Sequence, residues 1–412
     1  MNYILFDDSS RLDLFPLTLT RPVADIRIGI LTIREKWEKY LKAKTSTLTE
    51  KYLSTKYPVI KGKNNILING SVLPSAALVK EINRLKPDQA LVGNDYIIAF
   101  NINEKDLVGN ETIDSALVED SDRLDMEGLN EIECNVPHLK IFYPWDIFTH
   151  NGEALKADYQ LITKGRKTAA ISSSNKLIGQ EHIFIEEGAT VECAMINASA
   201  GPVYIGKDAE VMEGALIRGP FALCEHAALK MGAKIYGPTT IGPYSKVGGE
   251  LTNTVIFGYS NKAHDGFIGN SVIGEWCNMG ADSNNSNLKN TYDDVKMWNY
   301  AQEKFISSNL QFCGLIMGDH SKCGINTMFN TGTVIGVNAN IFGHGFQRNF
   351  IPSFSWGSST SGYTTYDVVK AMEVAKNVYQ RRGLEFTKVD EDILKSVFNL
   401  TFSYRKKVKF IK

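Results

Sequence analysis

The sequence predicts a two-domain protein: an α/β domain over about the first 160 residues, followed by a parallel β-solenoid that ends in a short helical tail. Three observations support this prediction. Strand-like and helix-like segments alternate in the front part, aliphatic residues recur every six positions in the second part, and apolar residues take helical spacing near the end. With 412 residues, of which 43% are hydrophobic, the chain can form two or three domains with a large core.

The front domain, residues 1–160 including its linker, is predicted from the alternating segments. A Gly-Asn-Asp turn separates the last two expected strands. Alternation of this kind is typical of an α/β, Rossmann-like sheet domain. We expect a linker over residues 145–167. The expected strands are residues 3–6, 66–69, 90–92 and 96–100, and the expected helices are residues 28–41 and 74–85.

Residues 161–362 are predicted to form the solenoid. Eight aliphatic residues from Ile205 to Val247 follow in strict steps of six, and the same register returns from Met317 to Ile341. A period of six fits neither an α-helix nor an alternating strand, but it fits a coil of three short strands with one inward aliphatic residue on each side. A single coil cannot bury its own apolar side, so the coils must stack.

Two segments depart from the period. Residues 282–314 are polar and rich in Asn, so we predict a loop inserted into the solenoid; loops of this length are more often functional than accidental. Residues 363–412 are predicted to form the helical tail, with one helix toward Gly383 and a shorter one around residues 393–398. The final RKKVKFIK is expected to be a solvated basic end.

Composition excludes several classes of partner. Lys and Arg number 45 and Asp and Glu number 46, so the net charge of −1 provides no general field for nucleic acid or an anionic membrane. The six Cys have no CxxC pair and no zinc-type spacing, which is typical of reduced thiols. No apolar stretch approaches 18 residues, and acidic residues follow directly after the first six. We therefore expect a cytoplasmic protein without a signal peptide.

The segment NKAHDGFIGNSVIGEWCNMGADSNNSNLKN, residues 261–290, resembles the acetyltransferase half of the bifunctional GlmU-like enzymes that make UDP-N-acetylglucosamine. That family folds as a left-handed parallel β-helix of hexapeptide repeats and commonly forms homotrimers. The resemblance implies acetyl-CoA as donor and an amino-sugar phosphate, first of all glucosamine 1-phosphate, as acceptor. It makes His264 the catalytic base and Asn278, Asn287 and Lys289 substrate-binding residues.

The chemistry also follows from the residue types. Histidine has an ordinary pKa of about 6.5 and can take a proton from an amine at neutral pH. Lys246 stands before a Gly-Gly pair that would let a sugar phosphate approach closely. Two departures concern the particular sugar: Phe267 replaces the family's aromatic hydroxyl, and Ile325 replaces a Ser near its CoA site.

Two other interpretations of the histidines stay open. His264 could be an ordinary turn residue on a structural solenoid. His320 and His344 also suggest a zinc hydratase of the γ-carbonic anhydrase kind, although the pair of ligands at short spacing in that family is missing.

The front domain resembles the sugar nucleotidyltransferases but differs where they bind phosphate. After the strand YILF the chain has DDSSR in place of glycines, and then FPLTLTRP. Backbone N–H groups of Gly-rich loops surround phosphate, whereas Asp7 and Asp8 would repel it unless a divalent cation such as Mg²⁺ intervenes. Arg11 and Arg21 are the candidate nucleotide-binding residues. Ser71 stands where that family has a metal-binding Asp, and no resident metal site is predicted.

A resemblance over the whole chain rests on LTRPVADIRIGILTIREKW, KAHDGF, GEWCN, GLIMGDH and IPSFSWG. These segments are similar to a divergent GlmU-like family of Bacteroidetes-type bacteria. The resemblance implies an enzyme of sugar-nucleotide biosynthesis, with an N-acetyltransferase behind a divergent sugar-1-phosphate nucleotidyltransferase domain that would take an NTP. The alternative is a non-catalytic sugar-nucleotide-binding sensor or assembly scaffold.

Overall fold

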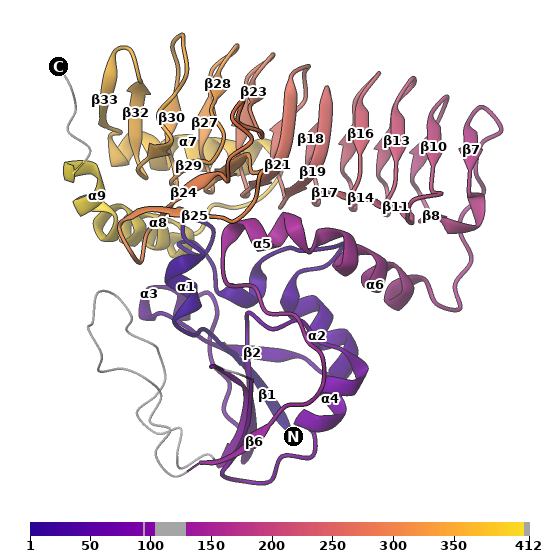
Figure 1. Cartoon of the computed structure of the whole chain (residues 1–412), viewed down its shortest axis with the longest axis vertical. Coiled ribbons are helices and arrows are strands. Elements are labelled where there is room, and N and C mark those ends of the chain that lie inside the picture. The colour runs from indigo at the N-terminus through magenta and orange to yellow at the C-terminus, as the bar shows by residue number, and fades with distance from the viewer. Residues whose placement is uncertain (94, 104–128, 408–412) are drawn as a thin grey trace.

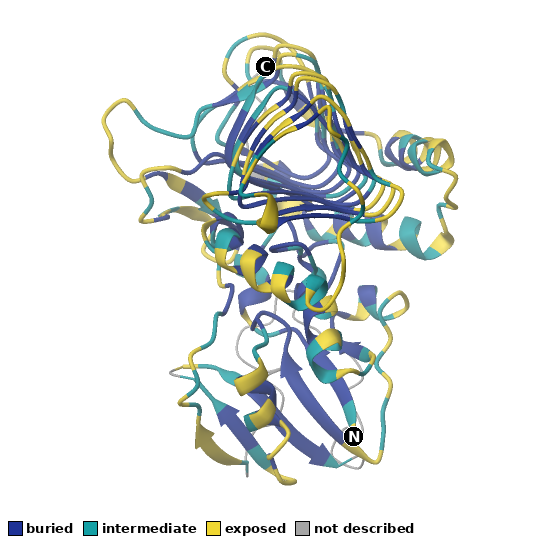
Figure 2. Cartoon of the chain, turned by 90° about the vertical axis from the view of Figure 1, so that its right-hand side faces the viewer, coloured by how far each residue is buried: buried dark blue, intermediate teal, exposed yellow. Residues whose placement is uncertain are grey.

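The computed structural model describes residues 1–93, 95–103 and 129–407. It shows an α/β domain beneath a long prism of stacked short strands (Figure 1). Viewed along the stack, the prism has a triangular outline with its buried residues inside (Figure 2). These features confirm the predicted fold class, an α/β front domain followed by a left-handed parallel β-helix and a helical tail.

The front sheet has the strand order β2-β1-β3-β5-β4-β6. β1 pairs in parallel with β2 and β3, whereas β5 pairs antiparallel with β3 and β4. Sequence analysis missed β2, whose sequence TSTL has no apolar alternation. The strands are β1 (Asn2–Phe6), β2 (Thr45–Leu48), β3 (Asn64–Asn69), β4 (Gln89–Val92), β5 (Ile97–Asn103) and β6 (Asn130–Glu133).

Helix α2 begins at Ile33, five residues after the expected start. Thr32 and Glu35 form a capping box there, in which Thr32 Oγ1 accepts from the backbone N–H of Glu35 at 3.2 Å. Gly29, at φ +72°, lies in the turn that occupies the preceding residues. The helices of this part are α1 (Ser10–Asp13), η1 (Val23–Asp25), α2 (Ile33–Leu41), α3 (Lys51–Ser54) and α4 (Ala76–Ile82).

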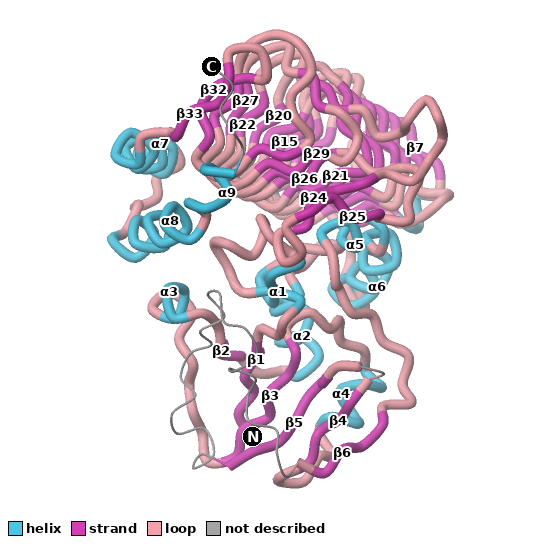
Figure 3. The backbone as a smooth tube through the Cα atoms, turned by 60° about the vertical axis from the view of Figure 1, so that its left-hand side comes forward, coloured by secondary structure: helices cyan, strands magenta, loops and turns pink. Residues whose placement is uncertain are grey.

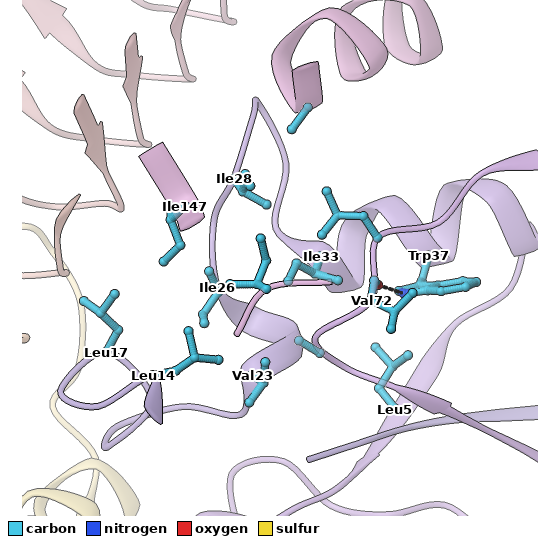
Figure 4. Close-up of a cluster of buried hydrophobic side chains, with 14 of the residues drawn as sticks. Leu5, Leu14, Leu17, Val23, Ile26, Ile28, Ile33, Trp37, Val72 and Ile147 are labelled. Carbon is cyan, nitrogen blue, oxygen red and sulfur yellow. Dashed lines mark hydrogen bonds between the residues drawn. The ribbon is translucent and has the colours of Figure 1, made fainter. Parts of the chain in front are cut away.

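The expected linker is instead helical. It forms α5 (Pro144–Thr149) and α6 (Asn151–Thr163), which lie between the front sheet and the prism (Figure 1). Ile147 of α5 joins Leu17 and Ile26 in one apolar cluster (Figure 4). Asp158 of α6 is buried and pairs with Lys36 of α2. Tertiary packing therefore orders a segment with weak local signals.

The β-helix has three faces, each a parallel ladder. Successive regular coils are 18 residues apart, as in Val203↔Phe221↔Thr239. Face 1 comprises β8 (Ile183–Ile185), β11 (Val203–Ile205), β14 (Phe221–Leu223), β17 (Thr239–Ile241), the second parts of β19 (Glu250–Ile256) and β21 (Phe267–Ile273), β26 (Leu315–Met317), β29 (Thr333–Ile335) and β31 (Phe350–Ile351).

The other two faces follow in the same coils. Face 2 comprises β9 (Thr190–Val191), β12 (Glu210–Val211), β15 (Ala228–Leu229), β18 (Lys246–Val247), β20 (Asn261–Lys262), β22 (Asn278–Met279), β27 (Lys322–Cys323), β30 (Asn340–Ile341) and β32 (Ser355–Ser358), to whose edge β33 (Gly362–Thr365) adds an antiparallel strand. Face 3 comprises β7 (Lys176–Ile178), which η3 (Gln180–His182) follows, β10 (Met195–Asn197), β13 (Leu216–Arg218), β16 (Lys234–Tyr236), the first parts of β19 and β21, and β23 (Asn284–Asn285) paired with β28 (Met328–Phe329).

The aliphatic residues of the six-residue series are buried in the prism, as predicted. The coils also continue through the region after Val247, where the strict period fails. Leu251 and Ile256 are the next buried aliphatic residues, at steps of four and five, because β19 turns its corner with fewer residues. The β-helix therefore tolerates shortened corners that periodicity alone does not reveal.

The predicted inserted loop is largely ordered structure. It contains an antiparallel hairpin, β24 (Lys296–Asn299) and β25 (Lys304–Ser307). Met297 and Tyr300 are buried in the core shared with the front domain, and Trp298 stacks on Phe350 at 4.3 Å. These apolar residues thus hold the insertion against the prism.

The tail forms α7 (Val368–Arg381), α8 (Lys388–Leu400) and α9 (Phe402–Lys407), which lie beside the last coils (Figure 3). Tyr379 of α7 stacks on Trp276 of the prism at 4.0 Å. The basic end is not wholly solvated, because Arg405 is buried and donates to the carbonyls of Ser353 and Phe398. Residues 408–412 of that expected basic end lie outside the described residues.

The front domain and the β-helix share one apolar core. Leu5 and Val23 of the front domain belong to the same buried cluster as Val255, Val272 and Val334 of face 1. The two domains are therefore packed as a unit. None of the described helices combines the length and the apolar character needed to cross a membrane.

Candidate functional site

His264 lies at a corner of the prism, between β20 on face 2 and β21 on face 3. Its side chain is exposed, and no described residue hydrogen-bonds its imidazole. Its backbone carbonyl, in contrast, accepts a 2.7 Å hydrogen bond from Lys262 Nζ. An exposed imidazole on an anchored backbone is suited to accept a proton from a ligand at this corner.

Lys246 and Asn278 project from face 2, on the rungs before and after that of Asn261. Lys246 is in register with Asn261, and Asn261 is in register with Asn278, so the three side chains form one outward row. Lys246 and Asn278 are exposed, whereas Asn261 Oδ1 accepts a 3.0 Å hydrogen bond from Arg382 Nη2. The structure thus places two predicted residues on the same face, with one rung between them.

Asn287 follows face 3 rather than face 2. Its Nδ2 donates to Asn270 Oδ1 at 2.9 Å. A Cβ added at Gly269 would lie 2.6 Å from both Asn287 Nδ2 and the ring of Phe267, so the amide and the ring flank this glycine closely. Lys289 donates to the carbonyl of Asp294 at 2.6 Å, which holds its ammonium within the insertion.

The predicted residues therefore fall into two groups on either side of the His264 corner. Face 2 presents a cation and amides, and face 3 presents an amide beside an aromatic ring. Sequence reasoning missed Asn261, although it lies in the segment NKAHDGF that carries the resemblance. It also missed Arg382, which reaches face 2 from the tail and for which the sequence gives no signal.

The loop after β1 is filled by internal partners. Asp7 accepts from Thr49 Oγ1 at 2.6 Å and from the backbone N–H of Val23 at 2.8 Å, and it pairs with Arg11. Burial raises the pKa of Asp7 despite the opposing effect of Arg11. Asp8 is bonded to Ser10, Asn69 and Lys140; burial opposes its charge, but Lys140 and these hydrogen bonds hold its pKa below the ordinary value.

Arg11 is fully buried within this loop. Its guanidinium donates to the carbonyls of Thr18 and Arg21 and to Tyr52 Oη, and it lies 3.6 Å from Glu50. This position at the carboxyl end of β1 is where the resemblance would place a nucleotide phosphate.

Arg21 joins the front domain to the prism. It forms an ion pair with Asp319 and lies 3.2 Å from Glu275 Oε1, both on the β-helix. Burial opposes its charge, but Asp319 and Glu275 outweigh burial and raise the pKa of Arg21. Its guanidinium is 6% exposed, so an interdomain ion pair is the role that its contacts indicate.

The described residues do not fit a Mg²⁺ site in the front domain. The carboxylates of Asp7 and Asp8 are already bonded to protein groups, and Ser71 hydrogen-bonds Asn69 Oδ1 at 2.6 Å. Over the part of the chain that the structure describes, no three His, Cys, Asp or Glu residues are grouped to hold a metal. The arrangement therefore lends no support to the zinc interpretation, and His320 is buried beside Trp276.

Comparison with known proteins agrees with this architecture. A family profile described as "Sugar nucleotidyl transferase" matches residues 3–167. A bifunctional protein GlmU of Methanococcus aeolicus is 34% identical over 22% of this chain and 21% of its own. A bifunctional sugar-1-phosphate nucleotidylyltransferase/acetyltransferase of Sulfurisphaera tokodaii is 30% identical over 34% of this chain and 35% of its own. The chain thus spans about a fifth to a third of the length of these curated relatives.

Among solved structures, an Arabidopsis UDP-N-acetylglucosamine acyltransferase matches 58% of this chain and 92% of its own at 15% identity, with a TM-score of 0.23. Values this low support no argument about function. The family profile places a sugar nucleotidyl transferase-type domain ahead of the β-helix. Over part of its length, the chain is thus similar to bifunctional GlmU proteins.

Proposed function

We propose that this chain is an acetyl-CoA-dependent N-acetyltransferase of sugar-nucleotide biosynthesis that acts on an amino-sugar phosphate, with glucosamine 1-phosphate as the first candidate. The observation that supports it is the exposed imidazole of His264 at the corner between face 2, which carries Lys246 and Asn278, and face 3, at whose far end Asn287 bonds Asn270. A histidine with only a structural role would not require polar side chains on the adjoining faces.

The reaction requires a proton acceptor and a hydrogen-bond donor that stabilises the oxyanion of the tetrahedral intermediate. His264 takes a proton from the amino group of the sugar, whose nitrogen then attacks the thioester carbonyl. Carbon–sulfur cleavage releases the CoA thiol, which takes up the proton. The carbonyl oxygen gains negative charge in the tetrahedral intermediate, and the amides of Asn278 and Asn287 are donors of the type that stabilises it. Lys246 supplies a cation for the phosphate.

The direct test supplies acetyl-CoA with a panel of amino-sugar 1-phosphates and follows the acetylated product by mass spectrometry. We expect His264→Ala to lower kcat by about 10²- to 10⁴-fold, the usual contribution of a general base. His182→Ala is the matched control, because His182 is also an exposed histidine of the β-helix but lies at its first coils. Equal activity of His264→Ala and the control would contradict the proposal.

A homotrimer is part of this proposal. On face 3 the rungs β7, β10, β13 and β16 leave large apolar side chains exposed: Ile178, Met195, Leu216 and Tyr236. Together with Arg218, Lys176 and Lys234 they line one open depression. A contiguous apolar surface of this kind is typical of a protein–protein contact. We infer that a second copy covers this patch, and that the subunits together complete the CoA site.

The front domain has a second candidate function, structural support of the acetyltransferase. The internal partners of Arg11, Asp7 and Arg21 favour it, because a nucleotide at the carboxyl end of β1 would have to displace them. The competing function is sugar-1-phosphate nucleotidyl transfer from an NTP. Pyrophosphate release from UTP and glucosamine 1-phosphate, measured with and without Mg²⁺, separates the two.

A thermal-shift titration with UTP and UDP-N-acetylglucosamine complements that measurement. Ligands that raise the melting temperature without pyrophosphate release indicate a sugar-nucleotide sensor, since a ligand of the native state stabilises it by mass action. Absence of both effects indicates a scaffold. Turnover with Mg²⁺ would contradict structural support as the function of this domain.

A further inference from the structure

Lys262 occupies an inward position of the β-helix. It is in register with Val247, and its residue is 2% exposed. The corresponding residues of seven other rungs of face 2, from β9 to β30, are apolar and buried: Val191, Val211, Leu229, Val247, Met279, Cys323 and Ile341. A charged residue therefore interrupts an otherwise apolar column, and it does so two residues before His264.

The ammonium of Lys262 bonds to the backbone of the His264 corner. Nζ donates to the carbonyl of His264 at 2.7 Å and to the carbonyl of Asp265 at 3.0 Å. A Cβ added at Gly249 would lie 2.9 Å from Nζ, so this glycine leaves the ammonium room on the previous coil. No described carboxylate hydrogen-bonds the ammonium.

The corner has few other anchors. Asp282 N–H donates to the carbonyl of Asp265 at 3.0 Å, and Phe267 N–H donates to Asn284 Oδ1 at 2.7 Å. The carbonyl of His264 has Lys262 as its partner among the described residues. The side chain that reaches from inside the prism is therefore what fixes the backbone of His264 while its imidazole stays exposed.

A lysine at this position works against stability. Burial lowers the pKa of Lys262 to about 8, although Asp265 among other groups opposes this shift. A methionine has a similar length and would fill the column without a charge to desolvate. Residues that break the local rule of a fold without improving its stability are expected at functional sites.

We propose that Lys262 is a positioning residue for His264, holding the corner carbonyls of residues 264 and 265 from inside the β-helix so that the imidazole is presented to the substrate. This role rests on the acetyltransferase function proposed above. Misplacement of a catalytic group by about 1 Å can cost about 10²-fold in rate. Substrate binding does not depend on the ammonium, because it contacts only the backbone.

The test is Lys262→Met in the full chain. We expect kcat to fall about 10- to 100-fold, while KM for acetyl-CoA and for the sugar phosphate changes less than about twofold. The melting temperature is expected to stay the same or to rise, since a buried charge is removed. A residue with only a structural role would give the opposite pattern, with a lower melting temperature and an unchanged kcat.

Asn175→Leu is the matched control. Asn175 is also buried in the β-helix and also holds backbone carbonyls, those of Ser172 at 3.1 Å and Val191 at 2.8 Å, but it lies at the first coils. We expect it to lower the melting temperature and to leave kcat unchanged. A wild-type kcat in Lys262→Met, or the same loss of kcat in both variants, would overturn the proposal.

A second readout keeps the two proposals distinguishable. Histidines labelled with ¹³C at Cε1 give one resonance each, and His264→Asn assigns the resonance of His264. Lys262→Met is expected to shift or broaden that resonance, and Asn175→Leu is not. Absence of acetyl transfer by the wild-type chain would refute the proposed function alone, whereas an unchanged His264 resonance in Lys262→Met would refute the positioning role.

Discussion

Removal of Arg21 tests the view that the front domain and the β-helix are held together as a unit. Arg21 pairs with Asp319 and lies 3.2 Å from Glu275 Oε1. Asp319 also accepts from Thr20 Oγ1 at 2.6 Å and from the backbone N–H of Glu275 at 2.8 Å. In Arg21→Met the carboxylate of Asp319 stays buried, at 4% exposure, without its counter-charge.

The magnitude follows from the cost of a buried charge that has lost its partner, about 3–5 kcal/mol. The entropy of unfolding is about 2 cal/mol/K per residue near 60 °C, which gives about 0.9 kcal/mol/K for a chain of 412 residues that unfolds as one unit. Arg21→Met is therefore expected to lower the melting temperature by about 3–6 °C. The double variant Arg21→Met with Asp319→Leu should lose less than the sum of the single variants.

Differential scanning calorimetry measures this effect, and Lys56→Met is the control. Lys56 also joins the front domain to another part of the chain, through Asp390 at 2.8 Å, but its side chain is 41% exposed. An exposed pair of this kind contributes about 0–1 kcal/mol, so its removal should shift the melting temperature by about 1 °C or less. Equal melting temperatures of Arg21→Met and the wild type, or two separate transitions in the wild type, would refute the reasoning.

Three further predictions address pH dependence, assembly and packing. Burial first, and then Lys322, Lys56 and Arg21, hold the pKa of His320 well below its ordinary value, so the unfolded chain takes up a proton below about pH 6.5 that the folded chain does not. The free energy of unfolding in urea should fall by up to about 1.4 kcal/mol per pH unit below that pH, and His320→Phe should reduce this slope. Leu216→Glu should dissociate the proposed trimer in sedimentation velocity, whereas Met231→Glu, at an exposed corner, should not. Gly242→Ala would place its Cβ 1.2 Å from the carbonyl oxygen of Phe257 and should prevent soluble expression, whereas Gly232→Ala, whose Cβ meets nothing within 4 Å but whose φ is +67°, should cost about 1–2 kcal/mol of unfolding free energy.

The candidate site was predictable from sequence only in part. The segment around His264 identifies the corner, because its residues carry a family resemblance. The row formed by Lys246, Asn261 and Asn278 does not follow from the period, since the register depends on a shortened corner between Val247 and Lys262. Arg382 comes from a helix of the tail, and nothing local in the sequence places it on face 2.

The front domain shows contacts that local signals do not reveal. The sequence predicts Arg11 and Arg21 as nucleotide-binding residues, because a positive charge near a phosphate loop suggests such a role. In the structure, both arginines form ion pairs within the protein. Arg11 pairs with Asp7 and Glu50, and Arg21 pairs with Asp319. The number of charged residues in a segment can be read from the sequence, whereas the fold determines which of them form ion pairs.

The sequence by itself determined the β-helix, since the inward or outward direction of each rung residue depends on spacing along the chain. It also determined the helices of the tail and the alternation of the front sheet. Tertiary structure alone decided that residues 144–163 are helical, that the insertion forms a hairpin, and that Lys262 reaches the carbonyl of His264 from inside the prism. These features depend on contacts between segments distant in sequence. The free energy that stabilises those contacts is gained only when the coils and the two domains pack.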